Sequence, residues 1–176
     1  FNVPMKDGKV TDTTRIDRTL PTLRELSEKG AKVIVISHLG RPKGQKKPEF
    51  TLKPVAEALA DALHAPVTFA PDCIGPEATG VVNAMKDGGF AMLENLRFYP
   101  QEEKNDAEFA KQLAENGDIL VSDAFSCSHR AHASVEALAR IIPSVAGRLM
   151  QAELEALEGA LVKPEHPVAA VVGGAK

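Results

Sequence analysis

Basic side chains follow four of the short apolar runs in this sequence. In chain order they are His38 and Arg41, Arg97, Arg130, and Lys176. An arginine presents a planar fork of N–H donors that suits phosphate and carboxylate groups, and it stays charged at any relevant pH. Cations gathered from several loops would bind a small ligand with more than one negative group. The sequence therefore predicts an anion site.

The apolar runs alternate with segments of helical pattern, and this alternation decides where the cations lie. The runs are 33–36, 67–69, 90–93, 119–121 and 168–172. All but the second are continuous, which is typical of strands buried on both faces. We expect an α/β fold, a three-layer Rossmann-like domain with a mainly parallel sheet and helices on both faces. Right-handed crossovers then place the carboxyl ends of the strands along one edge, where such sheets bind ligands.

The segments between the runs carry helix signals. Apolar side chains recur at helical spacing in 20–26, 52–63 and 150–161. Thr51 is the expected N-cap of the second of these helices. Asn105, with Glu108 three residues later, predicts the start of a further helix that ends near Gly117. The polar and basic stretch 41–48 is expected to be an exposed loop.

Composition limits the class of protein and its partners. The 176 residues are 44% hydrophobic and 26% charged, with a net charge of −3, which is ordinary for a soluble globular domain. A pI near 6.0 argues against a general nucleic-acid binder. The longest aliphatic stretch, 168–172, is far too short to span a membrane. We therefore expect no nucleic acid or membrane partner and a cytoplasmic location.

Other kinds of site have weaker signals. Cys127, His129 and His132 lack a fourth ligand at a known spacing, so we predict no metal site. Cys73 and Cys127 form no CxxC pair; a reduced protein is the simpler expectation, and one disulfide stays open. The sequence contains neither GxxxxGK[ST] nor a GxGxxG after a strand, which disfavours a P-loop or NAD-binding domain. The segment 173–176 is compatible with a turn that faces a phosphate.

Five motifs, in order, carry a resemblance that covers essentially the whole chain. They are F-N-V-P at 1–4, S-H-L-G-R-P at 37–42, L-E-N-L-R-F at 93–98, D-A-F-S-C-S-H-R-A-H-A-S at 123–134, and G-G-A-K at 173–176. The sequence resembles the phosphoglycerate kinase family. It departs from the family at 126–128, where Ser-Cys-Ser replaces Gly-Thr-Ala. The aspartate that precedes F-N-V-P in the family lies outside this sequence.

The resemblance implies a transferase of glycolysis that moves a phosphoryl group between ATP and the carboxylate of 3-phosphoglycerate, giving 1,3-bisphosphoglycerate and ADP. It implies these substrate-binding residues: Phe1, Asn2, Arg15, His38, Leu39, Gly40, Arg41, Arg97 and Arg130. Arg15 and Lys176 would also face the moving phosphoryl group as catalytic residues. Gly173, Gly174 and Lys176 would contact the nucleotide. Because a carboxylate needs no general base, the chemistry fits a site made of cations.

The resemblance also implies how the protein is organised. Residues 1–172 would form an N-terminal substrate-binding domain, and 173–176 would begin the nucleotide-binding domain. That C-terminal domain, absent from this chain, would hold most of the ATP or ADP and Mg²⁺, so the chain alone is expected to be inactive. We expect a monomer. The alternative from the residues alone is a non-catalytic anion-binding α/β module.

Overall fold

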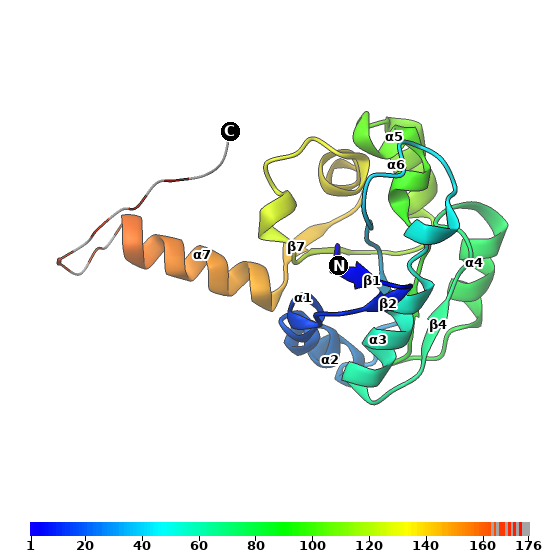
Figure 1. Cartoon of the computed structure of the whole chain (residues 1–176), viewed down its shortest axis with the longest axis horizontal. Coiled ribbons are helices and arrows are strands. Elements are labelled where there is room, and N and C mark those ends of the chain that lie inside the picture. The colour runs from blue at the N-terminus through cyan, green and yellow to red at the C-terminus, as the bar shows by residue number, and fades with distance from the viewer. Residues whose placement is uncertain (163, 165, 168, 170, 172, 174–176) are drawn as a thin grey trace.

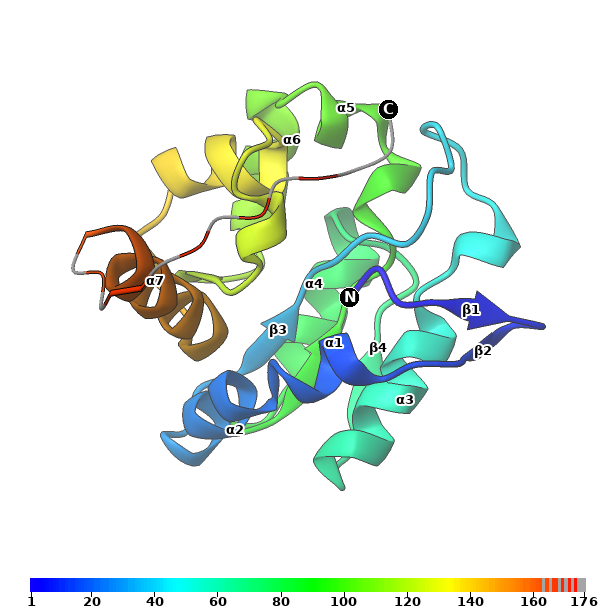
Figure 2. The same cartoon turned by 60° about the vertical axis from the view of Figure 1, so that its left-hand side comes forward.

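The computed structural model describes residues 1–162, 164, 166, 167, 169, 171 and 173. Its strands are β1 (Met5–Lys6), β2 (Lys9–Val10), β3 (Val33–Val35), β4 (Val67–Phe69), β5 (Phe90–Met92), β6 (Leu120–Ser122) and β7 (Ser144–Ala146). β5 lies between β3 and β4 in a parallel three-stranded sheet. β6 and β7 form a separate parallel pair, and β1 and β2 form an antiparallel hairpin beside α3 (Figure 2).

Helices fill the connections between the strands. The α-helices are α1 (Thr14–Asp17), α2 (Leu20–Glu28), α3 (Lys53–Leu63), α4 (Gly75–Ala84), α5 (Pro100–Glu103), α6 (Ala107–Ala114) and α7 (Arg148–Leu161). Short 3₁₀ turns are η1 (Pro48–Phe50), η2 (Leu96–Phe98), η3 (Phe125–Cys127) and η5 (Leu138–Arg140), and η4 (Ala133–Ala137) is a π-helix. Figure 1 shows α7 extending away from the rest of the fold.

Two apolar clusters cover the two faces of the three-stranded sheet. Alternate residues of a strand point to opposite faces, and β3 follows this rule. Val33 and Val35 belong to one cluster, with α2 and α3. Ile34 packs against the other, with α4 and α6. Every residue of β5 is buried. The fold class predicted from the sequence, a parallel sheet with helices on both faces, is confirmed.

The strands match four of the five apolar runs. The predicted run 119–121 is displaced by one residue in β6. In the fifth run, 168, 170 and 172 lie outside the described residues, and the described 169 and 171 are not in a strand. β7 was not predicted, because its three residues are all exposed and only one of them is a large apolar residue.

Helix ends and helix faces differ from the expectations at four places. The N-cap of α6 is Asp106, whose carboxylate accepts from the Phe109 N–H at 2.8 Å, and not Asn105. The C-cap of α6 is Glu115, so the helix ends before Gly117. The N-cap position of α3 is Leu52, although the Thr51 hydroxyl still accepts from the Lys53 N–H at 3.3 Å. In the stripe on α7, Met150 is buried and Leu154, Leu157 and Leu161 are exposed.

Two further observations bear on the expectations from composition. Both cysteines are free, Cys73 in the core and Cys127 half-buried, so they form no disulfide. Among the described residues, no helix is both long and apolar enough to cross a membrane.

Candidate anion-binding site

The loop after β3 is held against the first residues of the chain. The Phe1 nitrogen donates to Ser37 Oγ at 2.5 Å. The Asn2 side-chain oxygen accepts from the Gly40 N–H at 2.9 Å. Arg15, on α1, donates to the backbone oxygen of Asn2. The structure thus brings together three segments that the sequence separates, at the carboxyl end of β3.

Gly40 occupies a position that only glycine fits without strain. Its φ is +61°, in the left-handed region. A Cβ atom built there would lie 2.4 Å from the ring of Phe50. The turn at Gly40 lets its backbone N–H face Asn2 while its carbonyl accepts from Arg97 Nη1 at 3.0 Å. Gly40 is therefore the junction between the N-terminal segment and the loop after β5.

Arg97 follows β5 in the turn η2 and is 5% exposed. Besides its bond to Gly40, its Nε lies 3.5 Å from Glu103 Oε1. Asn95 caps η2 by accepting from the Arg97 N–H at 3.1 Å, and its amide nitrogen donates at 2.8 Å to the carbonyls of Leu39 and Phe50. This network fixes the arginine backbone to the loop after β3.

Glu94, directly before Asn95, is a buried carboxylate with three donors. The Thr51 hydroxyl donates at 2.6 Å, the Leu52 N–H at 2.8 Å and the Asn95 N–H at 2.7 Å. These bonds join the start of α3 to the end of β5. A buried charge is tolerated only when it is bonded in this way, so Glu94 supports the site instead of facing a ligand.

The pKa of His38, in the loop after β3, is affected by charged side chains of two other loops. Burial, and then the nearby Arg97 guanidinium, lower the pKa of His38 from 6.5 to about 3. Arg130 and His132 lower it further. Charges act on one another in this way only over short distances. Printed contacts agree: the Arg97–Gly40 bond joins the loops after β5 and β3, and the bonds between Glu102 and Ser134 join the segment after Arg97 to the loop after β6.

The third loop, after β6, is less enclosed. Arg130 is half-buried there, and its Nε lies 3.4 Å from His129 Nε2. Arg15 and Arg41 are exposed at the surface. A hollow beside Arg130 is lined by residues 128–131, Val135, Glu136, Ala139 and Arg140. The structure thus offers one enclosed arginine and three accessible ones.

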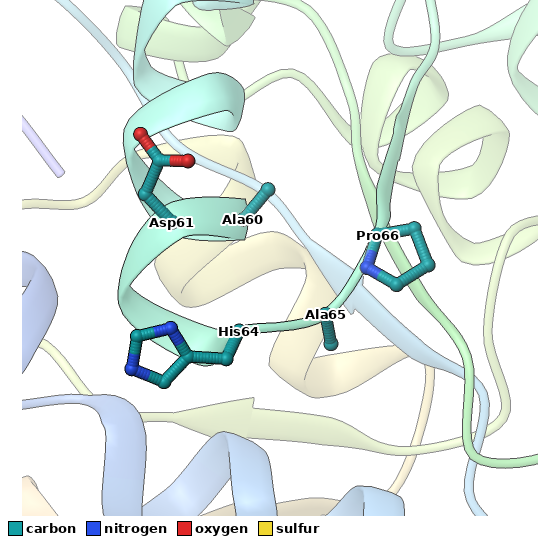
Figure 3. Close-up of a pocket in the computed structure, with 5 residues that line it drawn as sticks. All are labelled: Ala60, Asp61, His64, Ala65 and Pro66. Atoms are coloured by element: carbon teal, nitrogen blue, oxygen red, sulfur yellow. The ribbon is translucent and has the colours of Figure 1, made fainter.

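Another hollow lies away from this edge. Its lining residues are Ala60, Asp61, His64, Ala65 and Pro66, at the end of α3 and just before β4 (Figure 3). Because this is the amino end of a parallel strand, the hollow lies at the opposite edge of the sheet from the cations. We assign it no role.

Some predicted residues cannot be placed. Gly174 and Lys176 lie outside the described residues, and Gly173 is exposed. Within the described part of the chain, no group of three or more His, Cys, Asp or Glu residues could hold a metal ion.

Sequence reasoning missed the residues that support the cations. Ser37, Glu94 and Asn95 lie within quoted motifs, next to His38 and Arg97, but they carry no positive charge. Their roles depend on partners about 40 residues away, such as Thr51 and Phe50. The available signal was position: polar residues at the end of a buried apolar run.

Comparison with known proteins decides the family. A sequence model described as phosphoglycerate kinase matches residues 1–176. The chain belongs to the phosphoglycerate kinase family. It is 60% identical to the phosphoglycerate kinase of Ruegeria sp. (strain TM1040) and 58% identical to that of Caulobacter sp. (strain K31), over all of this chain and 44% of each relative.

Solved structures of the family share the fold. Phosphoglycerate kinase from Coxiella burnetii superposes with a TM-score of 0.86 and 42% identity, over 98% of this chain and 43% of that one. The enzyme from Pyrococcus horikoshii OT3 superposes with a TM-score of 0.83 and 37% identity, over 93% of this chain and 42% of that one. The chain thus spans less than half the length of its relatives.

Proposed function

We propose that this chain is the substrate-binding half of a phosphoglycerate kinase. The longer protein would move a phosphoryl group between ATP and the carboxylate of 3-phosphoglycerate, giving 1,3-bisphosphoglycerate and ADP. The observation that carries the proposal is that hydrogen bonds join the three strand-end loops that bear His38, Arg97 and Arg130, in a member of this family. Such a cluster repels itself when empty and suits a ligand with a phosphate and a carboxylate.

The proposed substrate-binding residues are those at this edge. Arg97 is already oriented by Gly40, whereas Arg15, Arg41 and Arg130 are accessible to a ligand. A depressed pKa makes His38 a neutral hydrogen-bonding group in the free protein, and a bound anion would favour its charged form. The remaining proposed contacts are Asn2 and the backbone around Phe1, Leu39 and Gly40.

The proposed chemistry needs positioned charge and no general base. A carboxylate oxygen of 3-phosphoglycerate forms a bond to the γ-phosphorus of ATP as the bond to the β-phosphate oxygen breaks, and ADP leaves with that electron pair. We assign to Arg15 the stabilisation of charge on the moving group, because it lies at the rim of the site beside Asn2. Lys176 would act from the nucleotide side.

We place ATP and Mg²⁺ outside the described residues. The described residues contain no group of three or more His, Cys, Asp or Glu side chains that could hold a metal ion, and the relatives are more than twice as long. In this proposal, residues 1–172 are the substrate domain, and Gly173, Gly174 and Lys176 begin the nucleotide domain. Closure of the two domains would exclude water and suppress ATP hydrolysis. A cytoplasmic monomer remains our expectation.

Calorimetry on the 176-residue chain tests the substrate. We expect weak binding of 3-phosphoglycerate, weaker binding of sulfate, and no turnover with ATP. Arg140→Ala is a matched control, since Arg140 borders the same hollow but pairs with Glu136 at 2.5 Å. Equal affinity for sulfate and 3-phosphoglycerate would contradict the proposal. If the longer protein binds 3-phosphoglycerate without turnover, a non-catalytic anion-binding module is the better description.

A further inference from the structure

Two adjacent acids on the short helix α5 face different cation-bearing loops. Glu102 and Glu103 come five and six residues after Arg97. The Glu103 side chain is 48% exposed and approaches Arg97 Nε at 3.5 Å. Glu102 is 3% exposed and points into the protein instead. Glu102 is therefore the buried member of the pair, and the proposed function gives it no role.

Glu102 binds the loop after β6 with both of its oxygens. Its Oε1 accepts from the Ser134 hydroxyl at 2.6 Å, and its Oε2 accepts from the Ser134 N–H at 3.0 Å. Ser134 lies four residues after Arg130, where that loop enters the helix η4. His132, between them, has its Nδ1 3.8 Å from Glu102 Oε1. The carboxylate thus lies directly beneath the residues that carry Arg130 and His132.

If the side chain at position 102 only filled space in the core, it would not need to carry a charge. Burial raises the pKa of Glu102, and the bonds from Ser134 and the nearby His132 oppose that shift. A buried carboxylate costs free energy that an apolar side chain of similar size would not. What the carboxylate adds is a two-pronged bond of defined geometry, from the segment that follows Arg97 to the segment that follows Arg130.

We propose that Glu102 is a positioning residue that sets the distance and angle between Arg97 and the Arg130–His132 loop. It reaches Ser134 across 32 residues of sequence, and it joins two of the three strand ends that make the site. The inference rests on the proposed function, because it assumes that both loops hold 3-phosphoglycerate. Glu102 touches no ligand in this proposal and acts only through Ser134 and His132.

The test uses the longer protein in a phosphoglycerate kinase assay. Glu102→Gln removes the charge and replaces one acceptor by an amide NH₂, so the Ser134 hydroxyl can no longer donate to that atom and must turn to accept from it. We expect the KM for 3-phosphoglycerate to rise roughly tenfold, with kcat and the KM for ATP changed less than about twofold. Ser134→Ala removes only the hydroxyl bond and should act in the same direction, but less. Glu108→Gln, on an exposed pair with Lys111, is the control.

A double-mutant cycle separates positioning from general damage. Because Glu102 acts through Ser134, the double variant should be little worse than Glu102→Gln alone. Additive effects, or equal rises in the KM for 3-phosphoglycerate and for ATP, would overturn the proposal. If Glu102→Gln does not fold, an unchanged KM in folded Ser134→Ala overturns it as well. An unsubstituted protein without turnover would instead refute the proposed function.

Discussion

The edge of the sheet that carries the basic side chains has two halves, one after β3 and β5 and one after β6. These halves are built differently. In the half formed by β3 and β5, Arg97 is nearly buried, and its backbone and side chain are bonded to Asn95 and Gly40. In the half that follows β6, Arg130 is half-buried beside His129, and the loop is held from beneath through Ser134. One half is fixed before any ligand arrives. In the other, the loop is fixed but its arginine is free to meet a ligand.

The sheets beneath the two halves differ in the same sense. β5 is flanked by a strand on each side and buried throughout. At the β6–β7 pair, Ile119, directly before β6, is 60% exposed, and Val145 in β7 is 53% exposed. Burial on both faces gives the first half a rigid base, because close-packed side chains resist displacement. Substitutions in the first half should therefore cost stability as well as binding, and those in the second half should cost binding alone.

The largest expected effect is the loss of stability on substitution of Asn95, in the first half. Asn95→Leu keeps the size but leaves the buried carbonyls of Leu39 and Phe50 without a donor. We expect the free energy of unfolding to fall by about 3 kcal/mol, measured by urea denaturation. Asn83→Ala, at an exposed position of α4, is the control and should change stability little. A loss as small as that of the control would show that this half is not fixed by Asn95.

Arg130→Ala, in the second half, should separate binding from stability. We expect affinity for 3-phosphoglycerate to fall at least tenfold, since a charged hydrogen bond contributes on the order of 1.5–3 kcal/mol. The urea midpoint should stay close to that of the unsubstituted chain, because Arg130 lies outside both apolar clusters. Calorimetry and urea unfolding of the same variant give both quantities. A large drop in stability would remove the distinction between the two halves.

The sequence predicted the first half better than the second for a physical reason. Buried parallel strands require continuous apolar runs, so β3, β5 and the cations after them could be located. β7 is exposed and has no such run, so it was missed. The apolar stripe at 150–161 correctly predicts the helix α7. It does not predict that most of this apolar face is exposed. Arg15 follows the short strand β2, which has no apolar run to reveal it, and was reached only through the family resemblance.

The residues that support the site were beyond pattern reading. Glu94 and Glu102 act through partners 43 and 32 residues away, and such contacts exist only in the folded chain. Asn105 was a reasonable N-cap by residue type. The chain turns there with a φ of 55°, and Asp106 caps the helix instead. By residue type, both Asn105 and Asp106 are good N-caps. In the folded chain the Asn105 side-chain oxygen accepts from the Ala137 N–H instead, which fits Asp106 as the cap.

The smallest effect, on pH dependence, tests whether the two halves share one electrostatic environment. In the folded chain the pKa of His38 is lowered from 6.5 to about 3, chiefly by burial and then by Arg97. Between these values the unfolded chain binds a proton that the folded chain does not, so His38 makes stability fall as pH falls.

His38→Gln removes this contribution. We expect the variant to lose less stability than the unsubstituted chain between about pH 7 and about pH 5, a window chosen to lie above most carboxyl titrations. Urea unfolding at both pH values gives the difference, with Asn83→Ala as the control for substitution itself. Since Arg130 also lowers the pKa of His38, NMR titration of His38 in Arg130→Ala should show a higher pKa. An unchanged His38 titration would mean that the two halves are electrostatically separate.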